Sequence, residues 1–120
     1  MNIKNYTAAA AIVKYRIVKP ATDGAVSLAT AATDSLIGVV DIPADAPAGA
    51  RVDVVRDGMA LIELGGTVAA GDFLTADANA MAITAAPAAG ANMRTIAIAE
   101  TSGVAGDVIY AQIEPGSIQG

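Results

Sequence analysis

Short runs of β-branched residues, separated by glycine, proline and aspartate, recur along the whole chain. The run Ile12–Lys19 begins with two apolar residues, then alternates polar and apolar side chains, and stops at Pro20. This alternation has a period of two residues and is typical of a strand with one buried face. Alanine, at 29 of 120 residues, favours helix by propensity alone. The alternation is the stronger signal, and it predicts strands.

The run Arg51–Arg56 alternates in the same way and is followed by Asp57-Gly58. Asp-Gly between two alternating runs is a strong signal for a tight hairpin turn. We therefore expect Met59–Leu64 to be the return strand of a hairpin, ending at Gly65-Gly66.

Six further runs of strand-like sequence lie between turn clusters. They are Ala25–Ala29, Leu36–Val40, Asp72–Thr75, Met81–Thr84, Met93–Glu100 and Val108–Glu114. Many short strands at this spacing indicate an all-β fold. We expect a small β-barrel or β-sandwich of about eight to nine short strands, with residues 12–120 forming a single β domain.

One turn sequence occurs more than once. Ala70-Gly71-Asp72 and Ala105-Gly106-Asp107 both precede an apolar strand, and Ala48-Gly49-Ala50 is a weaker third copy without the aspartate. Glycine supplies the positive φ that such a turn needs, and aspartate accepts hydrogen bonds from nearby backbone N–H groups. We expect repeated turn chemistry within one domain.

Charge is unevenly distributed along the chain. The first 19 residues carry four positive charges and no negative one, whereas the other residues contain three arginines and all twelve acids. Two interpretations are open: an extended N-terminal arm over residues 1–11 that docks on an acidic partner or subunit, or a first strand with a basic exposed face. Tyr6 is then either an interface anchor or a core residue. Tyr110, inside a predicted strand, is expected in the core.

The composition excludes most site chemistry. Without histidine or cysteine, the usual general bases, thiol nucleophiles and zinc ligands are missing together. The twelve carboxylates follow no calcium-loop spacing, so turn caps and solvated surface groups are expected of them. We expect no enzyme and no catalytic, metal or cofactor site.

The sequence also argues against nucleic-acid binding, a membrane span and a signal peptide. An acidic protein without a basic and aromatic surface is repelled by phosphates, so direct nucleic-acid binding is not expected. No apolar run is long enough to span a membrane. Lys14 interrupts the apolar stretch Ala8–Val13, so no signal peptide is expected.

The core must rest on 12 isoleucines and 11 valines, because alanine buries little area and the chain has only one Phe and three Tyr. A thin core in a small domain favours docking or self-association.

The order of several segments resembles the capsid cement (head decoration) proteins of tailed bacteriophages. These segments are Leu36–Val40, Gly49–Gly58, Gly66–Leu74, Ile96–Glu100 and Gly106–Ile113, and the stretch from Leu36 to Glu114 that contains them is about two-thirds of the chain. The resemblance implies a β-rich structural virion protein, made in the host cytoplasm, that binds the outer surface of the capsid and stabilises it against the pressure of packaged DNA.

The resemblance also implies partners and contacts. The partner would be the major capsid protein, and the chain would form a homo-oligomer, with a trimer favoured and a dimer possible. In such proteins a terminus often reaches onto the capsid or a neighbouring subunit. The predicted contact residues are Lys4, Tyr6, Lys14, Arg16 and Lys19. Deleting residues 2–11 is then expected to weaken shell binding and to leave the free domain folded.

Two other functions remain open. One is a non-enzymatic β-sandwich module that binds a glycan or peptide at a phage tail or a cell surface, although the chain has no tryptophan for stacking sugars. The other is a hydrolase, which would need two acids with perturbed pKa in a shared pocket.

Overall fold

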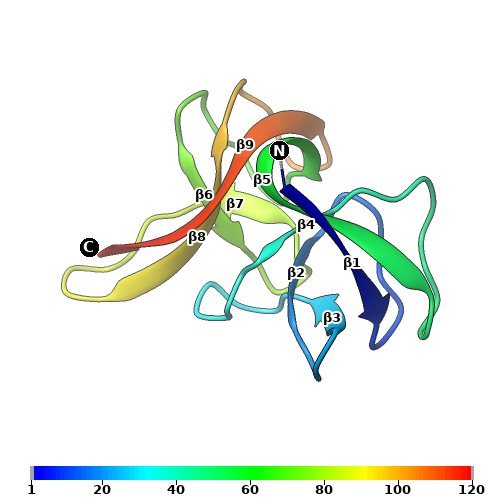
Figure 1. Cartoon of the computed structure of the whole chain (residues 1–120). Helices are drawn as coiled ribbons and strands as arrows, with labels where there is room; N and C mark the ends of the chain where they lie inside the picture. The colour runs from blue at the N-terminus through cyan, green and yellow to red at the C-terminus, as the bar shows by residue number, and fades with distance from the viewer. Residues whose placement is uncertain (1, 120) are drawn as a thin grey trace.

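The computed structural model describes residues 2–119, which form nine β-strands and, within that range, no helix (Figure 1). The strands are β1 (Asn2–Ala8), β2 (Ile17–Pro20), β3 (Ala25–Leu28), β4 (Gly38–Val40), β5 (Arg51–Glu63), β6 (Phe73–Ala76), β7 (Ala82–Thr84), β8 (Asn92–Ala99) and β9 (Val108–Gln119). The predicted all-β class and strand number are confirmed.

The first five strands close into a barrel. β1 pairs in parallel with β3 and antiparallel with the first half of β5. β2 lies between β3 and β4, and β4 pairs with β5, so the ring runs β1-β3-β2-β4-β5 and returns to β1. We call this ring barrel 1. A closed ring leaves no long unpaired edge on these strands.

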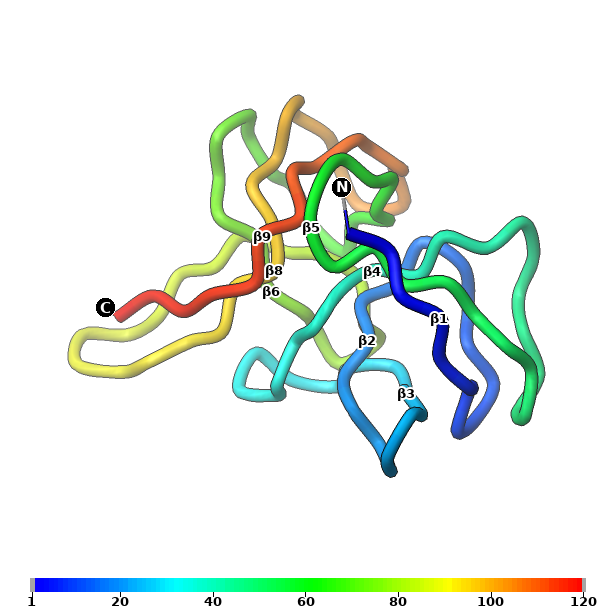
Figure 2. Tube along the Cα trace, viewed as in Figure 1, coloured from blue at the N-terminus to red at the C-terminus, as the bar shows by residue number. Residues whose placement is uncertain are grey.

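The second half of the chain repeats this arrangement. β9 pairs with the second half of β5 and with β8, and β6 lies between β8 and β7. A parallel bridge between Leu64 and Ala82 then joins the end of β5 to β7. We call this ring barrel 2. It has the same strand order as barrel 1, and the long strand β5 is shared by both (Figure 2).

The pairings of the two barrels match residue by residue. The β1–β3 pair Ala8↔Val26 has its counterpart in Leu64↔Ala82. Four more pairs of barrel 1 have a counterpart at the equivalent place in barrel 2. In barrel 1 they are Val18↔Leu28, Ile17↔Val39, Val40↔Val54 and Tyr6↔Val52. In the same order, their counterparts in barrel 2 are Leu74↔Thr84, Phe73↔Ile98, Ala99↔Ala111 and Ile62↔Ile109. The chain is therefore a tandem pair of one five-stranded unit.

The buried interiors correspond in the same way. Eight positions fill barrel 1: Tyr6, Ala8, Ile12, Val18, Val26, Val40, Val52 and Val54. Their counterparts are Ile62, Leu64, Val68, Leu74, Ala82, Ala99, Ile109 and Ala111, and all are buried. Valine dominates the first set, whereas the second set combines isoleucine and leucine with three alanines, so two different packings occupy equivalent positions.

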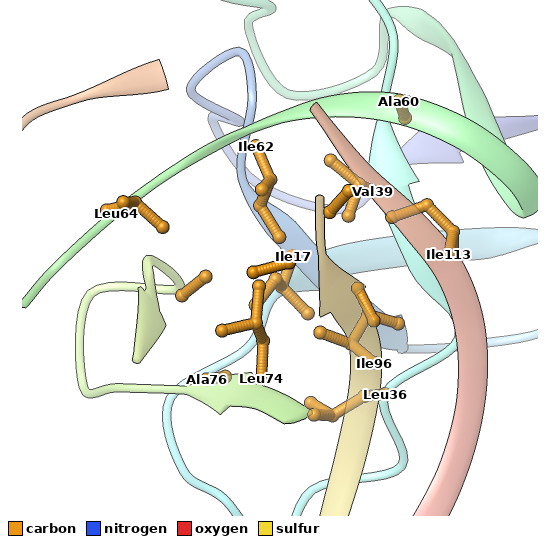
Figure 3. Packing of buried hydrophobic residues seen from close by; sticks show 14 of the residues in the cluster. Ile17, Leu36, Val39, Ala60, Ile62, Leu64, Leu74, Ala76, Ile96 and Ile113 are labelled. Carbon is orange, nitrogen blue, oxygen red and sulfur yellow. The ribbon is translucent and has the colours of Figure 1, made fainter. Parts of the chain in front are cut away.

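A further group of apolar side chains lies between the barrels. Ile17, Val39 and Val55 of barrel 1 belong to the same buried cluster as Ile62 and Leu74 of barrel 2 (Figure 3). Their sequence neighbours point instead into barrel 1. Strands β2, β4 and β5 are thus covered on both faces here, which explains why the polar and apolar alternation breaks into apolar pairs at these positions.

The predicted hairpin at Asp57-Gly58 is wrong. β5 continues through both residues, with Asp57 paired to β1 and Gly58 paired to Ile113 of β9. Gly58 has a φ of 111°, a conformation that glycine adopts without steric cost. The glycine therefore marks the place where β5 passes from one barrel to the other.

Residues 2–8 do not form a free arm, and the alternative of a first strand is the one the structure shows. β1 pairs with β5 from Asn2 to Thr7 and with β3 at Thr7 and Ala8. Closing barrel 1 requires this strand, because β1 alone joins β3 to β5. The expected boundary between an arm ending at residue 11 and a domain beginning at residue 12 is corrected accordingly.

The predicted turn chemistry is confirmed. Gly71 and Gly106 both have a φ of 90°. The Asp72 carboxylate accepts the N–H of Ala69 at 2.9 Å, and the Asp107 carboxylate accepts the N–H of Val104 at 3.0 Å. Gly49 holds the same place before β5, with a φ of 87°.

A fourth copy of this turn precedes β2 and has no glycine. Tyr15 takes the glycine position with a φ of 63°, and the bridge Ile12↔Ala46 matches the bridge Val68↔Gly103.

Candidate functional site

Two of the five predicted contact residues are ion-paired within the molecule. Arg16 reaches from barrel 1 to barrel 2, where its guanidinium lies 3.3 Å from the Glu63 carboxylate and donates to the Asn79 carbonyl at 2.9 Å. Lys19 lies 3.4 Å from the Asp34 carboxylate. Both side chains are half-buried, and Arg16 helps to fix the relative position of the barrels.

The other three lie at different depths. Tyr6 is buried in barrel 1, with 8% of its surface exposed, as the core alternative required. The Lys4 ammonium lies 5.5 Å from the centre of the Tyr6 ring, and the Lys14 ammonium lies 5.5 Å from the centre of the Tyr15 ring. Neither lysine forms an ion pair within residues 2–119, so these two keep their charge available to a partner.

Seven of the twelve carboxylates serve the fold. They cap turns, accept hydrogen bonds from side chains or pair with a cation: Asp34, Asp45, Asp53, Glu63, Asp72, Asp77 and Asp107. The backbone N–H of Thr30 and the neighbouring Lys19 ammonium lower the pKa of Asp34 below its usual value. No three acidic side chains in the described range could hold a metal ion. The backbone N–H groups that these carboxylates accept agree with the expected role in turn capping.

The β8–β9 ribbon borders a hollow. A cleft of about 570 Å³ lies against Leu36, Arg94, Pro115 and Ser117. Here β9 extends beyond barrel 2 toward the C-terminus (Figures 1 and 2). Arg94 is the single charged side chain lining the cleft. The cleft is shallow and contains no pair of groups suited to acid–base chemistry. In residues 2–119 no helix is long and apolar enough to cross a membrane.

The outer face of barrel 2 carries a row of side chains across four strands, three of them apolar and one a glutamine. Phe73 of β6 lies beside Ile98 of β8, Ile98 beside Gln112 of β9, and Gln112 beside Met59 of β5. Side chains opposite one another on neighbouring strands point to the same face of a sheet. The next pair along this face is Leu61 and Tyr110. We call these six residues the outer face.

The outer face is exposed. Phe73 is 48% accessible, Tyr110 56% and Met59 36%, which makes them three of the six large exposed apolar residues in the described range. The expected burial of Tyr110 is therefore wrong, because its side chain points away from barrel 2 while Ile109 and Ala111 point into it. The sequence pattern does not reveal this face, since outward apolar residues alternate just as inward ones do.

Three carboxylates surround the outer face without partners. Asp41 lines a hollow of about 170 Å³ together with Met59, Leu61 and Tyr110. Glu114 follows Gln112 by two positions within β9, which places it on the same side of that strand. Glu100 directly follows β8 and donates its backbone N–H to the Tyr110 carbonyl at 3.3 Å. None of the three accepts a side-chain hydrogen bond or forms an ion pair within residues 2–119. The face is thus apolar in the middle and acidic around it.

Comparison with known proteins shows a likeness to a solved structure. No protein-family profile matches the chain, and no curated protein matches it. The N base of the head fibre protein gp8.5 of bacteriophage phi29 has a similar structure, with a TM-score of 0.67 and 17% sequence identity. The match covers 94% of this chain and 93% of that one. The likeness therefore includes both barrels, and at this identity it establishes a shared fold.

Proposed function

We propose that the protein is a structural component of a phage virion, which binds the outer surface of the capsid and stabilises the shell against the pressure of packaged DNA. The observation that carries this proposal is the likeness to the N base of a phage head fibre, because it extends over nearly the full length of both chains. The resemblance of the segments between Leu36 and Ile113 to capsid cement proteins supports the same class of function.

We propose further that the protein acts by binding and not by catalysis. The chain has no histidine or cysteine, and most of its carboxylates are engaged by turns and neighbouring side chains. A repeating shell offers many identical sites, so modest affinity at each one suffices for stable decoration of the whole particle. The major capsid protein is the proposed partner.

Co-sedimentation with undecorated, expanded capsid shells tests this function. We expect saturable binding, with a fixed number of copies per shell, across a range of salt concentrations. Serum albumin added at the same concentration controls for trapping in the pellet. Failure to co-sediment at both low and moderate salt would overturn the proposal.

The stabilising role needs its own measurement. DNA-filled heads with and without the bound protein are heated, and DNA release is followed by the fluorescence of an intercalating dye. We expect decorated heads to release DNA at a higher temperature. Equal release temperatures at full occupancy would show binding without reinforcement. A glycan array probed with the same protein tests the alternative of a sugar-binding module.

A further inference from the structure

The two barrels carry equivalent outer rows of side chains, and the row of barrel 1 is covered at three of its four positions. In barrel 1 the row consists of Ile17, Val39 and Val55, which are at most 1% exposed because barrel 2 packs on them, and of Ile3 at its end, which is 46% exposed. The equivalent row of barrel 2 is Phe73, Ile98, Gln112 and Met59, and no part of the described chain covers it. The equivalent row is therefore mostly covered by the neighbouring barrel in barrel 1 and is left uncovered in barrel 2.

We infer that the outer face of barrel 2 is the surface that docks on another protein, whose own surface is apolar in the middle and surrounded by lysine and arginine. On the proposed function this partner is the capsid shell, and the inference rests on that function. Large exposed apolar side chains such as Phe73 and Tyr110 act as anchors in protein interfaces when they are buried there.

Charge selects the kind of partner. Residues 57–120 contain seven acids and a single arginine, Arg94, whereas residues 1–56 contain five acids and six basic residues. Asp41, Glu100 and Glu114 around the outer face have no partner within residues 2–119. A basic rim on the partner would pair with them, which speeds association and rejects acidic competitors.

The same charges argue against a second copy of this chain on this face. Two outer faces placed together would bring Glu100 and Glu114 of one copy toward the same carboxylates of the other. Like charges across an interface cost several kcal/mol. Lys4 lies on β1 of barrel 1, and Lys14 lies over the Tyr15 ring at the edge of the hollow that Asp41 lines, so carboxylates outnumber lysines around this face.

The test compares shell binding by the wild type with binding by matched surface variants. Phe73→Ala and Tyr110→Ala are each expected to weaken binding at least tenfold, because each removes an anchor of the outer face. Val104→Ala is the control, since Val104 is also a large exposed apolar residue, 55% accessible, but lies in a turn outside the face. Thermal unfolding of each variant checks that the barrels stay folded.

Charge reversal supplies an independent arm of the test. Glu100→Lys combined with Glu114→Lys is expected to weaken shell binding about tenfold at low salt, and by less at high salt because salt screens the partner's charges. Asp23→Lys, in an exposed turn of barrel 1, is the control. Lys4→Glu combined with Lys14→Glu measures the contribution of the N-terminal lysines to the same binding.

The outcomes separate the two proposals. If the wild type does not bind shells, the proposed function fails. If the wild type binds and the Phe73, Tyr110 and charge-reversal variants bind equally well, the function stands and the outer face is not its contact. If the wild type sediments in solution as a dimer or trimer that Phe73→Ala dissociates, the face joins copies of this chain, and its assignment to the shell is overturned.

Discussion

Barrel 1 and barrel 2 have the same strand order and the same eight interior positions, yet their outer surfaces differ. One outer row is buried between the barrels, whereas its counterpart is exposed and flanked by carboxylates. One half of the chain carries nearly balanced charge and the other is strongly acidic. Interior positions are limited by the geometry of a closed ring, but outer positions are free to change with each new contact. Divergence between the halves therefore indicates where the molecule meets its partners.

The interiors show how one framework accepts two packings. Gly38 of barrel 1 lies against Val54, and the counterpart positions in barrel 2 hold Ala97 and Ala111. A small residue beside a larger one in barrel 1 is replaced by two residues of equal size in barrel 2. The pair in barrel 2 has one carbon atom fewer and a different shape, a change small enough for a core to absorb by repacking.

The largest effect is expected from removing β1. Deleting residues 2–11 takes away the strand that closes barrel 1, so we expect loss of cooperative folding, measured by circular dichroism and two-dimensional NMR. This replaces the expectation that the free domain survives the deletion. Removing residues 117–120 is the control, because that end of β9 pairs only with β8 outside barrel 2. A folded, cooperative deletion variant would contradict the role of β1.

Gly38→Ala should be the most damaging point substitution. A Cβ at Gly38 would lie 2.5 Å from Cγ1 of Val54 and would also meet the Val55 carbonyl oxygen. We expect a loss of about 3 kcal/mol in the free energy of unfolding in urea. The counterpart change, Ala97→Gly, removes one buried methyl group and should cost about 1 kcal/mol. Equal losses would show that the two interiors are not packed differently at this position.

The turn glycines come next. Gly71→Ala and Gly106→Ala should each lower the free energy of unfolding by about 1 to 2 kcal/mol, because a Cβ is disfavoured at positive φ even with open space around it. Gly66→Ala is the control, since its Cβ would lie at an ordinary 3.5 Å from Ile83 and its φ is not positive. Gly71→Asn should cost less than Gly71→Ala.

Thr75→Val is expected to stabilise the protein by about 1 kcal/mol. The Thr75 hydroxyl is fully buried and has no hydrogen-bond partner within residues 2–119, so an isosteric apolar side chain removes an unmet polar group. Lys19 occupies the equivalent place in barrel 1, where it reaches Asp34. Thr84→Val is the control: the Thr84 hydroxyl donates to Asp72 at 3.1 Å, and its loss should destabilise. Chemical denaturation measures both.

The smallest effect concerns pH. Hydrogen bonding from Thr30 and the ion pair with Lys19 lower the pKa of Asp34 in the folded state. A lowered folded pKa contributes stability that is present above the unfolded pKa and lost as pH falls through the folded value. Asp34→Asn should therefore cost less than about 1 kcal/mol at pH 7, and the difference from wild type should shrink below about pH 4. Asp23→Asn is the control, and a constant difference between pH 7 and 3 would refute this origin.

The candidate site was the part least accessible from the sequence. Positive charge near the N-terminus predicts four of the five contact residues, and the enrichment of tyrosine at interfaces predicts Tyr6. Ion pairs engage Arg16 and Lys19, however, and Tyr6 is buried. Phe73 and Tyr110 gave no signal of their own, because one-dimensional alternation does not say which face of a strand turns inward. Which face of each strand turns inward is decided only when the strands pair and close the ring.

What the sequence determined by itself was local. β-branched alternation placed most of the strands, and glycine with aspartate placed the turns before β6 and β9, because backbone sterics and short-range hydrogen bonds act within a few residues. The tertiary structure decided that β1 belongs to a barrel, that Asp57-Gly58 is crossed by one strand, and that the five-stranded unit occurs twice. These features depend on pairing between residues far apart in the chain, and local sequence patterns do not predict such pairing.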